Sequence, residues 1–199
     1  MTNVLREEII EQPEVATRLL TEGWENIQRI AAAIRDQEIK YIFLTARGTS
    51  DNAGLYAKYL FGAHNRIPVA LAGPSLFSVY GAPPALEGAL VLGISQSGQS
   101  PDILSVIEEG IRQGVPTLAI TNDADSPLGQ AANYCIDILA GEEKAVAATK
   151  TYMAELLAIA LFSAALSENG GLSEALQQVP EYLTQTLALE SVMERAAAP

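Results

Sequence analysis

The sequence has 199 residues, enough for one substantial hydrophobic core but not for two domains of similar size. Twelve basic residues against twenty-four acidic ones give a net charge of −12, which argues against a nucleic-acid surface and against contact with an acidic membrane surface. The N-terminus has no signal-peptide pattern and no apolar run reaches about 18 residues, so we expect a cytoplasmic protein.

Five short apolar runs alternate with longer segments of helical pattern. The runs are almost continuously hydrophobic, which is typical of strands buried on both faces of a parallel sheet. Strands are expected over 41–46, 67–72, 89–95, 116–121 and 134–139, and helices over 51–63, 75–80, 101–113 and 127–132. This alternation predicts an α/β fold, a three-layer αβα sandwich around a five-stranded parallel sheet with the flavodoxin-like order 2-1-3-4-5.

Helical patterns also flank the sheet at both ends of the chain. Residues 13–36 read as one long amphipathic helix with Pro13 at its first position, and 147–167 as an Ala- and Leu-rich helix that stops at Asn169-Gly170-Gly171. A further helix over 172–193 has an apolar face but little nearby core. The apolar faces of 13–36 and 172–193 predict an oligomer, with a homodimer as the default.

Two polar loops follow the first and third predicted strands. They are Arg47–Asn52 and Ser95–Ser100, and with the order 2-1-3-4-5 they meet at the point where the strand order reverses. Each leads into a helix N-terminus, which favours an anion. Gly48 and Gly98 allow close backbone approach, and the two loops carry the hydroxyl groups of Thr49, Ser50, Ser95, Ser97 and Ser100. The pattern predicts a phosphate site that needs no Lys or Arg.

Helix capping is the alternative for single hydroxyls. Ser100 precedes Pro101 and Ser50 precedes Asp51, and both serines fit the N-cap position of a helix. A third polar stretch, 140–152, follows the fifth strand and contains Glu143 and Lys150. These two residues are catalytic candidates because of where the strand directs them; the alternative is a solvated loop with helix-end charges.

Other kinds of site are disfavoured. Neither a P-loop nor a dinucleotide-binding glycine pattern is present. His64 is the only histidine and Cys135 the only thiol, so we expect no metal site, no cofactor and no Ser-His-Asp triad. Cys135 lies in an apolar run and is expected to be a buried, inert thiol.

Four stretches in order resemble the SIS (sugar isomerase) domain family, specifically the first of the two SIS domains in the isomerase half of glutamine–fructose-6-phosphate aminotransferase and in related deaminases and deglycases. The matching stretches are MTNVLREEIIEQP, ARGTSDNAG, SQSGQSPD and EEKAVAATKTYMAEL. The resemblance spans essentially the whole chain. It divides the chain into N-terminal helices (1–36), a sugar-phosphate-binding SIS domain (37–168) and a connector helix (172–199) toward a second SIS domain that is absent from this sequence.

The resemblance implies a role for individual residues. Ser95, Gln96, Ser97 and Ser100 would hold the phosphate with help from Ser50, and Gly48, Thr49, Val146 and Ala147 would face the sugar. Two positions depart from the family pattern. Ala148 replaces a frequent serine, and Arg47 replaces a cysteine, where it could reach an anion or line a subunit contact.

The resemblance also predicts a function. We expect the hexose 6-phosphate or amino sugar 6-phosphate binding half of an aldose–ketose isomerase or a glucosamine-6-phosphate synthase- or deaminase-like enzyme, with little turnover by this chain alone. The family's catalytic glutamate, histidine and lysine lie in the second SIS domain and its tail. Two alternatives stay open: a non-catalytic sugar-phosphate sensor, and a single-SIS isomerase of the phosphoheptose type.

Overall fold

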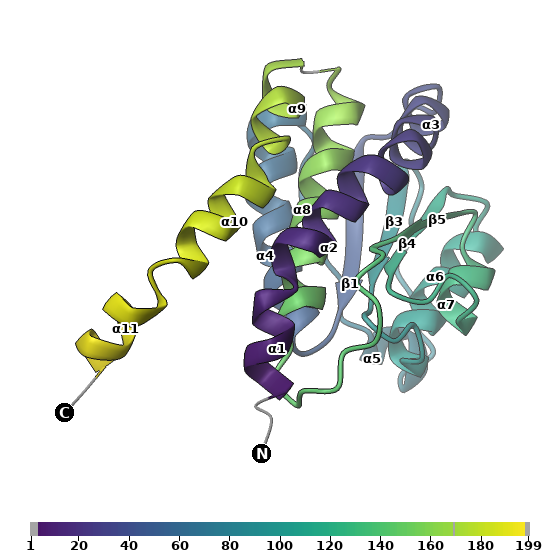
Figure 1. Cartoon of the computed structure of the whole chain (residues 1–199). Helices are drawn as coiled ribbons and strands as arrows, with labels where there is room; N and C mark the ends of the chain where they lie inside the picture. The colour runs from purple at the N-terminus through teal and green to yellow at the C-terminus, as the bar shows by residue number, and fades with distance from the viewer. Residues whose placement is uncertain (1–3, 169, 198–199) are drawn as a thin grey trace.

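The structure, a computed structural model, describes residues 4–168 and 170–197 and contains one five-stranded sheet (Figure 1). All strand pairs are parallel and the order is β2-β1-β3-β4-β5, which confirms the predicted α/β fold. The strands are β1 (Tyr41–Ala46), β2 (Val69–Leu71), β3 (Ala89–Ile94), β4 (Thr117–Thr121) and β5 (Tyr134–Asp137). Every residue of β3 and β4 is buried, as continuous apolar runs predict, whereas the short edge strand β2 is half exposed.

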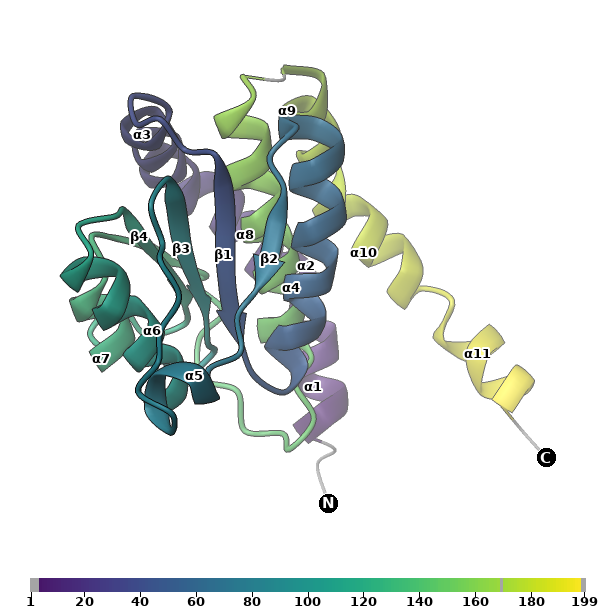
Figure 2. The same ribbon diagram turned by 180° about the vertical axis from the view of Figure 1, so that it is seen from behind.

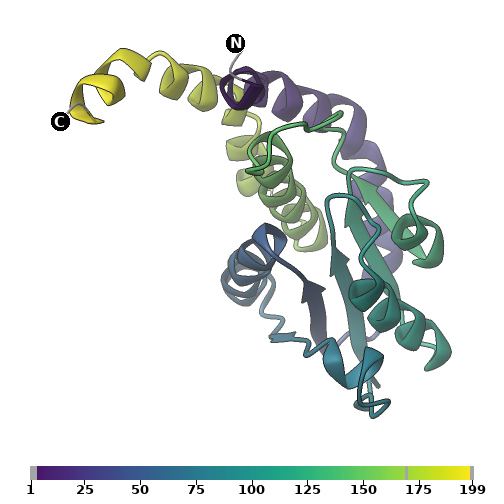
Figure 3. The ribbon, with the colours of Figure 1, turned by 90° about the horizontal axis from the view of Figure 1, so that it is seen from below.

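Helices cover both faces of the sheet (Figure 3). The strands alternate with α4 (Thr49–Leu60), α5 (Ser75–Ser78), α6 (Pro101–Arg112) and α7 (Pro127–Ala131), and a π-helical turn η2 (Phe61–Asn65) extends α4. The segments outside the sheet are α1 (Val4–Ile10), α2 (Gln12–Arg18), the π-helical turn η1 (Leu19–Gly23), α3 (Trp24–Arg35), α8 (Lys150–Leu166), α9 (Gly170–Leu176), α10 (Val179–Leu187) and α11 (Glu190–Ala197). One core cluster joins the sheet to α3, α4 and α8, and a second joins it to α6 and α7.

The helix α8 lies in the middle of this arrangement. It packs against α3 and α4 and also against α2, so thirteen of its residues are buried and its apolar residues occupy all sides. It begins at Lys150, three residues later than predicted. It ends at Leu166, and Glu168 adopts a left-handed φ of 51° just beyond the end. Asn169, part of the predicted stop signal, lies outside the described residues.

The predicted long helix over 13–36 is present as an uninterrupted helical segment over residues 12–35, with Pro13 in its first turn. It consists of α2, η1 and α3, and the π-helical turn η1 departs from regular α-helical geometry. Its apolar face is buried within the chain, since Leu19, Ile27 and Ile34 are almost fully covered. This face therefore gives no reason for a partner chain.

The prediction of one helix over 172–193 is wrong, because the segment divides into α9, α10 and α11. Pro180 lies in the first turn of α10, where proline is tolerated but would break a continuing helix. Leu176, Val179 and Leu183 pack on the core beside α2, so part of the predicted unburied face is covered. The end of α10 and all of α11 project from the body of the molecule (Figures 1 and 2), and Arg6 of α1 forms an ion pair with Glu190 of α11.

Within the described residues, no helix combines the length and the apolar character needed to cross a bilayer.

Candidate functional site

The loop after β1 turns directly into α4. Gly48 occupies the N-cap position with φ 60° and ψ −129°, a conformation that residues with a side chain rarely adopt. Thr49 is the first residue of α4 and is exposed, and Ser50 is the second and is buried. Ser50 therefore lies inside the helix, and the capping alternative for this residue is wrong.

The loop after β3 turns on a second glycine. Gly98 has φ 62°, and a Cβ built on it would lie 1.9 Å from Ser126 Oγ. The Ser126 hydroxyl caps α7 by accepting a hydrogen bond from the Gly129 N–H at 3.2 Å. Leu128 N–H donates to the Gly98 carbonyl at 3.2 Å. The β3 loop is thus held tightly against the start of α7.

The hydroxyls of the β3 loop keep their protons available. Ser95 Oγ accepts a hydrogen bond from Gly98 N–H at 3.2 Å, and Ser97 Oγ accepts one from Gln99 N–H at 3.3 Å. Ser100 is at the N-cap of α6, but its side chain makes no capping bond. In the described part of the chain, none of these three hydroxyls donates to a protein acceptor. Since a phosphate only accepts hydrogen bonds, all three can serve it as donors.

The two loops lie at the same edge of the sheet. β1 and β3 are neighbours, and their last residues, Ala46 and Ile94, are register partners. Arg47 in the first loop forms an ion pair with Asp102 in the first turn of α6. Hydrogen bonds from Arg47 and then from Ser78 lower the pKa of Asp102. The arginine thus joins the starts of α4 and α6 within the chain, and its side chain stays largely exposed. The two alternatives for Arg47, an anion contact and a subunit contact, stay predictions.

A buried carboxyl group lies behind the first loop. Ser50 Oγ donates to Glu155 Oε1 of α8 at 2.8 Å, and Glu155 is 1% exposed. Burial raises the pKa of Glu155 to about 7, although the Ser50 hydrogen bond lowers it, and the nearby charge of Glu143 raises it further. At neutral pH this group can both hold and release a proton.

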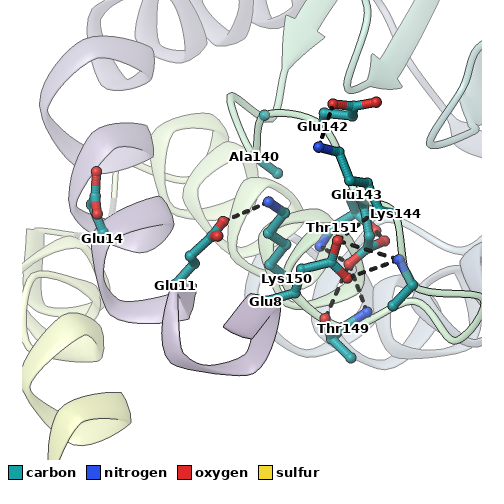
Figure 4. Close-up of polar contacts among 12 residues, drawn as sticks. Glu8, Glu11, Glu14, Ala140, Glu142, Glu143, Lys144, Thr149, Lys150 and Thr151 are labelled. Carbon is teal, nitrogen blue, oxygen red and sulfur yellow. Dashed lines mark hydrogen bonds and ion pairs between the residues drawn. The ribbon is translucent and has the colours of Figure 1, made fainter. Parts of the chain in front are cut away.

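The third stretch is tied down by three carboxylates (Figure 4). Glu143 accepts hydrogen bonds from the backbone N–H and the hydroxyl of both Thr149 and Thr151, so it organises the start of α8. Glu8 of α1 accepts from the N–H groups of Lys144 and Ala145. These contacts give Glu143 a structural function; its catalytic function stays a prediction.

Lys150 has the third carboxylate as its partner. Its Nζ lies 2.6 Å from Oε2 of Glu11, the residue between α1 and α2, and the Lys150 side chain is only 5% exposed (Figure 4). Because both ammonium and carboxylate are engaged, Lys150 joins α8 to the N-terminal helices. A catalytic function for Lys150 also stays a prediction. Val146 and Ala147, the predicted sugar contacts, are exposed in the loop between these anchors.

We expect Glu11→Gln to lower the free energy of unfolding by about 1 to 3 kcal/mol, because it leaves the buried Lys150 ammonium without its anionic partner. Glu14→Gln, in the first turn of α2, is the matched control. It removes an exposed pair with Arg18 and should cost only about 0.3 to 0.5 kcal/mol. Urea unfolding of both variants measures the difference, and equal losses would contradict a stabilising function for the buried pair.

Comparison with known proteins supports one family. The model of the SIS domain matches residues 37–165, which is well over half of the chain. The chain belongs to the SIS domain family. This confirms the resemblance found in the sequence motifs.

Relatives of this SIS domain are isomerising aminotransferases. The chain is 34% identical over 174 residues to glutamine–fructose-6-phosphate aminotransferase of Streptococcus pyogenes serotype M6, which covers 85% of the chain and 29% of the aminotransferase. The chain spans about a third of the length of the curated relatives it matches.

Solved structures share the SIS fold. A candidate phosphosugar isomerase from Silicibacter pomeroyi DSS-3 is 42% identical with a TM-score of 0.88, and the match covers 90% of this chain and 55% of that one. The C-terminal domain of glucosamine–fructose-6-phosphate aminotransferase from Francisella tularensis is 26% identical with a TM-score of 0.78, covering 95% and 55% of the two chains. The domain is therefore a phosphosugar isomerase-like SIS domain.

The remaining candidate residues lie elsewhere in the SIS domain. His64 is exposed in η2 and lines a hollow of about 240 Å³ at the amino end of the sheet, away from the two polar loops. Cys135 is half-buried in β5, and burial raises the pKa of its thiol to about 11, with smaller contributions from Asp137 and Asp123. Among the described residues, no group of three or more His, Cys, Asp or Glu side chains is placed to hold a metal ion.

Sequence reasoning missed three acids of this site: Glu8, Glu11 and Glu155. Glu155 had one signal in the sequence, because it is the only charged residue between Lys150 and Glu168 in an otherwise apolar helix. A lone acid at such a position must be paired or have a raised pKa.

Proposed function

We propose that this SIS domain binds a hexose 6-phosphate, with the phosphate between the N-termini of α4 and α6. The observation that carries the proposal is the set of three hydroxyls with uncommitted protons, Ser95, Ser97 and Ser100, beside two helix N-termini at the reversal of strand order. Backbone N–H groups and the hydroxyls supply donors without a buried cation.

The sugar would lie between the loop after β1 and the loop that precedes α8, at the carboxyl end of the sheet. Gly48 and Thr49 on one side, and Val146 and Ala147 on the other, are exposed at the carboxyl end of the sheet and are available to sugar hydroxyls. Gln96 is half-buried in the phosphate loop, and Ser50 would complete the phosphate contacts.

The reaction class follows from the relatives. Their names describe isomerising aminotransferases acting on fructose 6-phosphate and phosphosugar isomerases. We therefore assign the chain to the substrate-binding half of an aldose–ketose isomerase or of a synthase- or deaminase-like enzyme for amino sugar phosphates. Moving a proton between C1 and C2 requires a base at the sugar. Glu143 is occupied by four hydrogen bonds and His64 lies at the other end, so we expect little turnover without further groups.

A sugar-phosphate sensor and a single-SIS isomerase of the phosphoheptose type remain the alternatives. The net charge of −12 disfavours a sensor that binds DNA through this chain. The position of His64 disfavours an isomerase that uses its own histidine at this edge.

A homodimer and a cytoplasmic location stay predictions. Exposed apolar side chains that a second copy could cover lie on α4 and the adjacent edge strand, at Leu55, Tyr56, Tyr59 and Leu71. Others lie in the C-terminal segment, at Tyr182, Leu189, Val192 and Met193. These two surfaces, and not the buried face of 13–36, support the expectation of a dimer.

Calorimetric titration with fructose 6-phosphate tests the proposed function. Ser97→Ala removes a hydrogen bond to a charged group, worth about 1.5 to 3 kcal/mol, so the affinity should fall by roughly 10- to 100-fold. Ser105→Ala on α6 is the control, because its hydroxyl donates to the Asp102 carbonyl and does not face the loop. No binding at millimolar ligand, or equal affinity of both variants, would contradict the proposal.

A further inference from the structure

The Ser50–Glu155 hydrogen bond limits what Ser50 can offer a ligand. A hydroxyl has one proton, and an ionised carboxylate has none to give. With Glu155 ionised, Ser50 must direct its proton to Glu155 Oε1 at 2.8 Å. Its oxygen then has only lone pairs left to offer a ligand.

An anion at this edge meets two unfavourable features. A phosphate accepts hydrogen bonds, so it gains no bond from the Ser50 lone pairs. The ionised Glu155 and Glu143 would also lie near a second anion, with little water between, since Glu155 is 1% exposed. The β3 loop differs, because Ser95 and Ser97 accept from backbone N–H groups and keep their own protons.

Protonation of Glu155 removes both features at once. The carboxylic acid can donate its proton to Ser50 Oγ, and the Ser50 proton can then turn toward the phosphate. One negative charge also disappears from beside the ligand. The proton comes from the solvent and stays on Glu155, and no covalent bond of the ligand changes.

We propose that binding of a phosphorylated sugar at this edge is coupled to the uptake of one proton by Glu155, with Ser50 relaying the change to the phosphate. Glu155 is then a positioning residue that acts through Ser50. This inference rests on the proposed function.

The surroundings of Glu155 make the coupling measurable near neutral pH. Burial raises the pKa of Glu155 to about 7, so in mildly alkaline solution Glu155 is ionised in most molecules. Several ionisable groups lie on the neighbouring segments: Glu143 before α8, Lys150 on α8 with Glu11 just before α2, Asp51 on α4, Arg35 on α3 and His64 in η2. Of these, only Glu143 contributes to the raised pKa of Glu155, and Lys150 is engaged by Glu11.

Calorimetry in buffers of different ionisation enthalpy tests the coupling. Fructose 6-phosphate is titrated into the full chain at about pH 8, where the phosphate ester itself is fully ionised. We expect uptake of about one proton per ligand, and an affinity that falls by about tenfold for each further pH unit. Glu155→Gln, whose amide can donate to Ser50 as the protonated acid does, should bind with almost no proton uptake and a flat pH dependence.

Two further variants keep the test decisive. Asp51→Asn removes an exposed acid from the same end of α4 and should retain the proton uptake of the wild type. Ser50→Ala keeps Glu155 but breaks the relay, so only charge repulsion still couples binding to protonation. This variant should bind more weakly and take up clearly less proton than the wild type, which keeps the test usable even if Glu155→Gln fails to fold. Binding by the wild type without uptake, or full wild-type uptake in Ser50→Ala, would overturn the inference and leave the proposed function intact. No binding by any variant at any pH would instead overturn the proposed function.

Discussion

Gly98→Ala should lower the free energy of unfolding by about 2 to 5 kcal/mol and disrupt sugar-phosphate binding. The left-handed backbone at this position costs a residue with a side chain about 1 to 2 kcal/mol. Its Cβ would also lie 1.9 Å from Ser126 Oγ and 2.5 Å from Ser126 Cβ. Relieving that overlap requires the β3 loop or the start of α7 to move, at about 1 to 3 kcal/mol.

Gly114→Ala is the matched control for this prediction. Gly114 has φ 72°, and a Cβ there would meet nothing within 4 Å. It should therefore cost only the backbone strain, about 1 to 2 kcal/mol. Denaturant unfolding of the two variants separates strain from overlap. Equal losses would show that the contact between the β3 loop and Ser126 is not tight.

Glu155→Gln should change how stability depends on pH. Burial raises the pKa of Glu155 from 4.5 to about 7 in the folded chain, so the folded state holds this proton more tightly than the unfolded state. The resulting stabilisation is fully present below the unfolded pKa and is lost as pH rises toward about 7. The wild type should therefore lose about 2 to 3 kcal/mol from this group between roughly pH 5 and pH 8, and the glutamine variant should not.

The difference between the two unfolding curves isolates Glu155, because all other acids titrate in both proteins. The quantity to compare is the free energy of unfolding of the glutamine variant minus that of the wild type. This difference should be more favourable to the variant at about pH 8 than at about pH 5. Asp51→Asn should follow the pH dependence of the wild type, since Asp51 is exposed. Parallel profiles for the wild type and Glu155→Gln would contradict a buried carboxyl group with a raised pKa.

The sheet could be predicted because its strands are encoded locally. A run such as Ala89–Ile94 is apolar at every position, and only burial on both faces accounts for that. The strand order 2-1-3-4-5 is common in such sheets, and with this order the loops after β1 and β3 meet at one edge.

The terminal helices could be predicted only in part, because the pattern over 172–193 does not encode its breaks. The apolar residues at helical spacing continue from α9 into α10, although a turn separates the two helices. What covers these faces was also not predictable. Ile27 and Ile34 are buried by α8 and the sheet, which are far away in sequence.

The supporting acids of the site depend on tertiary contacts. Glu155 meets Ser50 across 105 positions, and Lys150 meets Glu11 across 139. No local pattern encodes such pairs, although a lone acid or base in a buried helix signals that a partner exists. These contacts explain the acidic residues of the N-terminal motif. Glu8 binds the loop that precedes α8, and Glu11 binds Lys150 at the start of α8 (Figure 4).

A crystal structure of the chain with fructose 6-phosphate is the most direct test of the site. We expect the phosphate between the N-termini of α4 and α6, with hydroxyl oxygens of Ser95, Ser97 and Ser100 about 2.5 to 3 Å from phosphate oxygens. A phosphate bound instead in the hollow near His64, at the amino end of the sheet, would contradict the account.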